Sequence, residues 1–238
     1  MRIFKFGGAS VKDADGIHNM YRVLEHTGHE NTLIVVSAMG KTTNALEKLI
    51  KVYFEDSLKT ESQLNEVIDY HLGIMNEIFD HPMHEVFDEV KGRFDHLRTF
   101  LKTNKSPHYS FVYDQVVSTG ELVSTTIITH YLNSKGISAD WLDARECIQT
   151  DASYRDANVD WTRTEVAINE QVSPNRLYIT QGFIGSDDNN FTTTLGREGS
   201  DYTAAIFAYC LNGSSVTIWK DVPGVLNADP RHFESTQL

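Results

Sequence analysis

The segment TLIVVSA at residues 32–38 constrains the fold most strongly. It is short, rich in β-branched residues and almost free of polar side chains. Such a run suits a parallel strand that helices cover on both faces. Residues 2–6 read as an earlier strand, and residues 11–26 between the two carry apolar side chains at helical spacing. Two strands joined by a helix predict a parallel sheet with helical crossovers.

The next segments are helical. Residues 42–56 have helical spacing, with Thr42 or Thr43 as the expected N-cap. Two amphipathic patterns follow at residues 62–79 and 84–101, and Pro82 forces a turn between them. We therefore predict an antiparallel helical hairpin inserted at about residues 58–104.

The α/β rhythm then resumes. We expect a strand or turn leading into a helix (114–136), then a strand (137–144) and an irregular stretch (150–175). A strand running into a hairpin (176–196) and a helix (200–213) should follow. The last predicted strand (214–224) ends in a type II turn at Val222-Pro223-Gly224. The predicted fold class is α/β: a three-layer, open, mostly parallel sheet with helices on both faces and an inserted helical hairpin subdomain. The 238 residues suit one such domain.

Net charge, cysteine content and histidine spacing indicate which partners, compartment and metal sites to expect. The net charge of −12 disfavours nucleic acid and anionic membranes as partners. Cys147 and Cys210 are too few for a disulfide framework and are expected to be reduced thiols in the cytoplasm. The segment HPMHE at 81–85 lacks the HExxH spacing of a metal site, so we expect a turn there and no protein-held metal.

Glycine-bearing segments follow or flank the predicted strands: KFGGAS (5–10), SAMGKTTN (37–44), STGELVST (118–125) and LGREGSDYTA (195–204). Ligands of open parallel sheets bind beyond the carboxyl ends of the strands, where glycine lets backbone N–H groups approach an anion. Neither the Walker A pattern nor GxGxxG is present. Each segment taken alone has a purely structural interpretation, and an isolated Gly7-Gly8 pair is more often only a tight turn.

Lys5 lies inside a strand predicted to be covered on both faces. A buried ammonium group is costly unless it is paired. Arg197, Ser200 and Asp201 cluster at a helix start, although Ser200 also suits a simple N-cap. We predict that Lys5 points toward Asp201 and the strand ends rather than into the core.

Taken together and in this order, KFGGAS, VVSAMGKTTN, STGELVST, LGREGSDYTA and WKDVPGVLNADPR resemble the catalytic domain of aspartate kinases, within the wider amino acid kinase family. The resemblance runs from residue 1 to about residue 233. It implies that ATP phosphorylates the β-carboxylate of L-aspartate, giving 4-phospho-L-aspartate, the first step of lysine, threonine and methionine biosynthesis. ATP and Mg²⁺ are the implied cofactors. A homo-oligomer is the implied assembly.

The resemblance also assigns roles to residues. Lys5 and Asp201 are the implied catalytic residues. ATP would contact Lys5, Gly7, Gly8, Ser10, Lys220, Asp221, Gly224, Asp229 and Arg231. Aspartate would contact Ser37, Thr43, Glu121, Arg197 and Ser200, with Arg197 on the α-carboxylate and Glu121 on the α-ammonium group.

Some of these positions have other readings. Glu121 also suits a helix-start carboxylate interacting with the dipole, and Asp221 and Asp229 also suit turns. Glu198 stands where the family commonly has glycine, so we expect its side chain to point away from the anion site. Lys220 and Leu226 also depart from the common pattern, which makes the nucleotide contacts the weakest part of the comparison.

The chain stops at Leu238, shortly after NADPR, whereas relatives continue with further nucleotide-binding and regulatory segments. The resemblance therefore implies a catalytic domain that is incomplete at its C-terminus. Two alternatives stay open: another amino acid kinase, such as an acetylglutamate kinase, and a non-catalytic ligand-binding module on the same fold.

Overall fold

The computed structural model describes residues 1–81, 84–220, 224, 227–228, 232–233 and 235–237. Within them a five-stranded sheet runs in the order β3-β4-β2-β1-β7, and every neighbouring pair is parallel. The strands are β1 (Arg2–Phe6), β2 (Thr32–Val36), β3 (Asp140–Leu142), β4 (Leu177–Gln181) and β7 (Ser215–Trp219). The predicted parallel sheet is confirmed.

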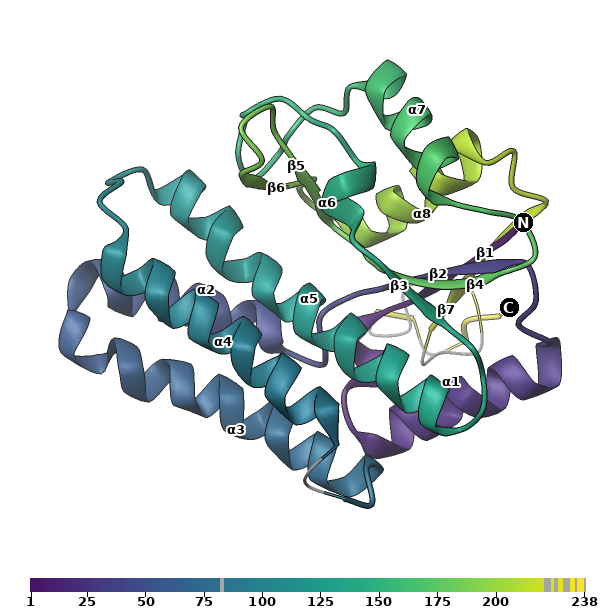
Figure 1. Ribbon diagram of the computed structural model, residues 1–238, viewed down its shortest axis with the longest axis horizontal. Coiled ribbons are helices and arrows are strands. Elements are labelled where there is room, and N and C mark those ends of the chain that lie inside the picture. Colours follow the sequence, from purple (N-terminus) through teal and green to yellow (C-terminus); the bar gives the residue numbers. More distant parts are fainter. Residues whose placement is uncertain (82–83, 221–223, 225–226, 229–231, 234, 238) are drawn as a thin grey trace.

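Side chains alternate between the two faces of the sheet, and each face has its own core. Phe4 and Ile34 belong to the larger core, whereas Ile3 and Leu33 belong to the second one. Five helices bury the larger core: α1 (Ala14–Thr27), α2 (Thr42–Glu55), α3 (Thr60–Ile78), α4 (Glu85–Thr103) and α5 (Tyr109–Ser134). The second core lies under α6 (Ala144–Cys147), α7 (Trp161–Gln171) and α8 (Gly199–Cys210). Figure 1 shows these helices on opposite sides of the strands, which gives the predicted three layers.

The two helices expected between residues 58 and 104 are present as α3 and α4, after a short 3-10 helix, η2 (Ser57–Lys59). Both contribute to the larger core, together with α2 and α5. Figure 1 shows α2, α3, α4 and α5 packed against one another on one side of the sheet. Pro82 lies outside the described residues, and the standing of this segment as a subdomain stays a prediction.

The expectation of a strand or turn at the start of 114–136 is wrong, because α5 is helical from Tyr109 to Ser134. Most of its residues from Val112 to Leu132 are buried. A helix that is covered on nearly all sides shows no polar stripe, so its periodicity cannot be read from the sequence. Gly120 lies inside this helix and packs against α2, where an added Cβ would be 3.1 Å from Thr42 Cγ2.

The stretch 150–175 is not wholly irregular, because it contains α7. Only Thr164 and Ile168 of this helix are buried. Two inward positions give too weak a pattern to separate a surface helix from a polar loop. Asp160 caps the helix, since its side chain accepts a hydrogen bond from the Arg163 N–H.

The predicted N-caps of two helices are also wrong. Lys41, not a threonine, is the residue before α2, and the Thr42 hydroxyl donates to the Met39 carbonyl at 2.6 Å. Glu198, not Ser200, precedes α8. The Ser200 hydroxyl is engaged elsewhere, as described below.

The structure also bears on the predicted hairpin, the cysteines and the predicted turn. The expected hairpin is present as β5 (Ile184–Ser186) paired antiparallel with β6 (Thr192–Thr194). Both cysteines are free and buried. Of the expected type II turn, Val222 and Pro223 lie outside the described residues. Among the described helices, none is both long and apolar enough to cross a membrane.

Candidate active site

An ion pair joins the interior strand β1 to the start of α8. Lys5 Nζ lies 2.7 Å from Asp201 Oδ1, and the side chains are 10% and 23% exposed. Lys5 leaves β1 on the same face as Ile3, the face that α8 covers, so the register of the strand directs it to Asp201. The predicted direction of Lys5 is therefore confirmed.

Beside this pair lies a cavity of about 370 Å³, within the range of small-molecule sites. Its walls bring together residues far apart in the sequence. They are Lys5, Ser37, Thr43, Tyr113, Glu121, Arg155, Phe183, Gly196, Arg197, Glu198, Gly199, Ser200 and Asp201. All five residues predicted to contact an amino acid, and both predicted catalytic residues, are in this set.

Glu121 is a buried carboxyl group with only one of its two oxygens hydrogen-bonded. Its Oε1 accepts a hydrogen bond from the Ala38 N–H at 3.3 Å, whereas its Oε2 has no hydrogen-bond partner among the described residues. Burial raises the pKa of Glu121 to about 8, and the hydrogen bond from Ala38 opposes this rise. A cationic group in the cavity would satisfy this carboxylate and restore its charge.

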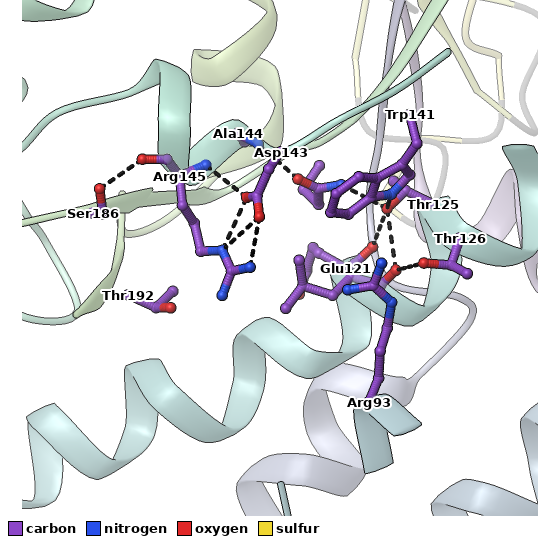
Figure 2. A network of polar contacts seen from close by, with 12 residues as sticks. Arg93, Glu121, Thr125, Thr126, Trp141, Asp143, Ala144, Arg145, Ser186 and Thr192 are labelled. Atoms are coloured by element: carbon purple, nitrogen blue, oxygen red, sulfur yellow. Dashed lines mark hydrogen bonds and ion pairs between the residues drawn. The ribbon is translucent and has the colours of Figure 1, made fainter. Parts of the chain in front are cut away.

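Hydrogen bonds one turn along α5 fix the helix segment that carries Glu121. The Thr125 hydroxyl donates to the Glu121 carbonyl at 2.9 Å and accepts from Trp141 Nε1 at 3.0 Å. Gln181 Nε2 also donates to this hydroxyl, at 2.7 Å. Figure 2 shows Thr125 between Glu121 and the Trp141 ring, which the Arg93 guanidinium covers at 4.6 Å. These contacts join α5 to β3 and β4, so Glu121 has a rigid support.

The serines of the cavity link β2 to α8. The Ser37 hydroxyl donates to the Ser200 hydroxyl at 2.9 Å, and the Ser37 carbonyl accepts from the Ser124 hydroxyl at 2.9 Å. Gly182 leaves room for the Ser200 side chain, because a Cβ at residue 182 would lie 2.4 Å from Ser200 Oγ. Ser200 therefore lies at a crossing of three elements and is more than a helix cap.

Arg197 and Glu198 form the exposed rim of the cavity. Their side chains are 95% and 69% exposed and approach each other to 4.0 Å. The outward direction expected for Glu198 agrees with this exposure, although the residue also lines the cavity. Its φ of +56° lies in the left-handed region that favours glycine. Glutamate therefore occupies a backbone conformation that is better suited to glycine.

The glycine loop after β1 adjoins the ion pair. A Cβ at Gly7 would lie 3.5 Å from Lys5 Nζ, and the Gly8 carbonyl accepts from the Gly40 N–H at 2.9 Å. This backbone bond holds the loops after β1 and β2 together. Ser10 lies in the following 3-10 helix, η1 (Gly8–Val11), and is not among the residues lining the cavity.

The other residues predicted to contact a nucleotide are less well defined. Lys220 Nζ lies 3.9 Å from Asp201 Oδ2, so this lysine reaches the same carboxylate as Lys5. Gly224 is exposed. Asp221, Asp229 and Arg231 lie outside the described residues.

Three residues of the cavity lie outside the motif segments singled out in the sequence: Tyr113, Arg155 and Phe183. Phe183 could have been found, because it lies just past the carboxyl end of β4, in the stretch predicted as a strand running into a hairpin. Tyr113 precedes the segment expected to carry the helix. Arg155 lies in the stretch expected to be irregular, where no local signal indicates its neighbours.

Comparison with known proteins gives consistent results. The sequence profile of the amino acid kinase family matches residues 1–238. The chain is 32% identical over 232 residues to lysine-sensitive aspartokinase 3 of Escherichia coli, covering 96% of this chain and 51% of that protein. It is 31% identical over 241 residues to a chloroplastic bifunctional aspartokinase/homoserine dehydrogenase 2 of Arabidopsis thaliana, covering 96% and 26%.

The fold is similar to that of E. coli aspartokinase III solved with aspartate and ADP. The TM-score is 0.90 at 31% identity, over 100% of this chain and 53% of the other. The chain thus spans about half the length of this relative, or about a quarter of the bifunctional one.

Proposed function

The chain belongs to the amino acid kinase family, and from this premise we propose that it transfers the γ-phosphoryl group of ATP to the β-carboxylate of L-aspartate. A β-carboxylate oxygen would attack the γ-phosphorus, and the bond to the bridging oxygen of ADP would break. The products are 4-phospho-L-aspartate and ADP. This reaction would open the biosynthesis of lysine, threonine and methionine.

The observation that carries the proposal is the buried, half-satisfied Glu121 in the same cavity as Arg197. An L-amino acid brings an ammonium group for Glu121 and an α-carboxylate for Arg197. The β-carboxylate of aspartate can then face Lys5. The solved relative that contains aspartate and ADP supports this choice of substrates.

The chemistry requires little acid–base work from the protein. A carboxylate is already ionised at neutral pH, so no general base is required. The difficulty is that one anion must approach a polyanion. Catalysis would therefore rest on positioning and on cations that stabilise the transferred phosphoryl group.

In this proposal Lys5 is the principal cation, and Asp201 holds it at the end of β1. The backbone of Gly7 and Gly8, with the Ser10 hydroxyl, would lie along the phosphates. Ser37, Thr43 and Ser200 would contact the amino acid. Lys220 and Gly224 would lie toward the nucleotide.

Mg²⁺ is part of the proposal and would enter with ATP to neutralise phosphate charge. It is usually bound through one or two carboxylates together with phosphate oxygens. Asp201 could supply such a carboxylate, because its Oδ1 pairs with Lys5 and its Oδ2 makes only a long ion pair of 3.9 Å with Lys220, which Mg²⁺ would have to displace. This oxygen can therefore face a cation.

We also propose a cytoplasmic homo-oligomer that binds neither nucleic acid nor membrane. Two buried free thiols are typical of a reducing compartment, and the acidic charge repels polyanions. Light scattering on the purified chain would give the assembly state.

Trapping of the acyl phosphate by hydroxylamine tests the activity. With ATP, Mg²⁺ and L-aspartate we expect a hydroxamate, and with N-acetyl-L-glutamate we expect none. The N-acetyl group removes the ammonium charge that Glu121 would bind. A hydroxamate from N-acetyl-L-glutamate alone would identify an acetylglutamate kinase. Binding of both ligands without any product would favour the non-catalytic module.

A further inference from the structure

Arg155 is an arginine of the cavity wall that neither the sequence patterns nor the proposed chemistry accounts for. It lies in the loop between α6 and α7. Among the described residues, its guanidinium forms no ion pair with a carboxylate. A cation in a cavity that would receive a dicarboxylate is therefore left without a carboxylate partner among the described residues.

The loop is fixed against the cavity by its backbone. The Arg155 N–H donates to both oxygens of the buried Asp114, at 3.1 and 3.0 Å. Asp114 also accepts from the N–H and the hydroxyl of Thr194, each at 2.8 Å. Ala157 N–H donates to the Thr194 carbonyl at 2.9 Å. Residue 155 is thereby tied to both α5 and β6.

The side chain is also held in place. The Arg155 guanidinium lies 4.6 Å from the centre of the Tyr113 ring and 5.7 Å from that of Tyr109. The Tyr113 hydroxyl donates to Glu47 at 2.8 Å, which fixes the ring. Stacking on aromatic faces leaves the edge of a guanidinium free for an anion.

The neighbouring turn places Arg155 beside Arg197. A Cβ at Gly196 would lie 3.4 Å from the Arg155 carbonyl and 2.4 Å from Asp156 Oδ1. The two arginines therefore come from touching segments at one end of the cavity. Both arginines are exposed residues, but Arg155 is in addition held by the two tyrosine rings and by its backbone.

The backbone conformation adds to the argument. Arg155 has a φ of +75°, which is unfavourable for any residue with a Cβ and natural for glycine. The chain thus carries a long cationic side chain at a position where glycine would be less strained. Residues held in such sparsely populated backbone conformations cluster at active sites and ligand sites.

We propose that Arg155 is a second receptor for the α-carboxylate of the amino acid, acting with Arg197 to select a substrate with a free α-carboxylate. This inference rests on the proposed function. Because the α-carboxylate does not react, its contacts should affect binding of the amino acid more than the chemical step.

The test measures the affinity of the full chain for two ligands by calorimetry. One ligand is L-aspartate, and the other is L-isoasparagine, in which the α-carboxylate is replaced by an amide. Arg155→Gly removes the side chain and suits the positive φ, so the fold should persist. We expect it to weaken L-aspartate binding about tenfold or more, because a hydrogen bond to a charged group is lost. Binding of L-isoasparagine should change less than twofold, and Arg155→Lys should recover part of the loss.

Each other outcome is decisive. If Arg155→Gly leaves the affinity for L-aspartate within twofold, the inference is wrong and the proposed function stands. If both ligands lose affinity equally, Arg155 supports the loop and does not select the α-carboxylate. If the wild-type chain binds no L-aspartate, the proposed function fails, and this inference fails with it.

Discussion

Lys5 and Asp201 form an ion pair of 2.7 Å that connects strand β1 of the parallel sheet to the first turn of α8. The two residues are nearly two hundred positions apart in the sequence. Their contact places an ammonium group where the strand ends open into the cavity. The proposed activity depends on this charge.

Replacing Lys5 tests that dependence. Lys5→Ala should lower kcat by about 10²- to 10³-fold, the effect of losing one group that stabilises charge in a transition state. Lys51→Ala, at an exposed position on α2, is the matched control and should change kcat little. Steady-state kinetics and thermal unfolding together give the answer. A kcat that survives Lys5→Ala in a folded protein would remove Lys5 from the mechanism.

Glu121 predicts a pH dependence of stability. Its pKa is raised from 4.5 to about 8 in the fold by burial, so between these values the folded state holds a proton that the unfolded state has lost. Stability should therefore fall as pH rises from 4.5 to 8, by roughly 3–5 kcal/mol in total from this group. Glu121→Gln cannot ionise, and its chemical denaturation curves should lack this slope. An equal slope in wild type and variant would contradict the assignment.

The same carboxyl group predicts proton release on ligand binding. At pH 7 free Glu121 is mostly protonated, and an arriving ammonium group would favour its ionised form. Binding of L-aspartate should then release about one proton per site. Calorimetry in buffers with different ionisation enthalpies measures this number directly. Glu121→Gln should abolish the release, and a wild-type value near zero would place the ammonium group elsewhere.

Gly7 and Gly8 should respond differently to the same change. A Cβ at Gly8 would lie 2.5 Å from the Ala38 carbonyl oxygen, so Gly8→Ala should cost about 1–3 kcal/mol of stability through overpacking. At Gly7 the nearest atom is Lys5 Nζ at 3.5 Å, an ordinary contact. Gly7→Ala should spare stability and weaken binding of ATP. Equal loss of stability in both variants would show that Gly7 serves the fold alone.

Two substitutions of Glu198 separate the effect of its charge on ligand binding from the effect of its backbone conformation on stability. Glu198→Gly and Glu198→Ala both remove a carboxylate from the rim of the cavity, and both should strengthen binding of anionic ligands. Only glycine suits the φ of +56°, so Glu198→Gly should be about 1 kcal/mol more stable than Glu198→Ala. Denaturant unfolding compares the two variants. A more stable alanine variant would show that the left-handed conformation carries no strain.

The sheet and the central ion pair could be predicted from sequence because both rest on strong, local rules. Short β-branched runs alternate with helical patterns, and a lysine within a covered strand must find a partner. The residues that would bind an amino acid were foreseen through their resemblance to known motifs, and the cavity brings all five together.

Features that depend on distant packing could not be predicted. The buried α5 has too little polar surface to show a helical period, and α7 buries too few residues to show one. The interpretation of Ser200 as an N-cap is wrong, because its hydroxyl contacts Ser37, a residue that only the fold brings near. Arg155 reaches the cavity through Asp114 and Tyr113, neither of which is near it in sequence.

Direct observation of the phosphorylated product by ³¹P NMR tests the central claim. With MgATP and L-aspartate, the wild-type chain should produce an acyl-phosphate resonance together with ADP, and the Lys5→Ala variant should produce neither at a comparable rate. ATP consumption that yields only inorganic phosphate, or an acyl phosphate that forms from N-acetyl-L-glutamate but not from L-aspartate, would contradict the account.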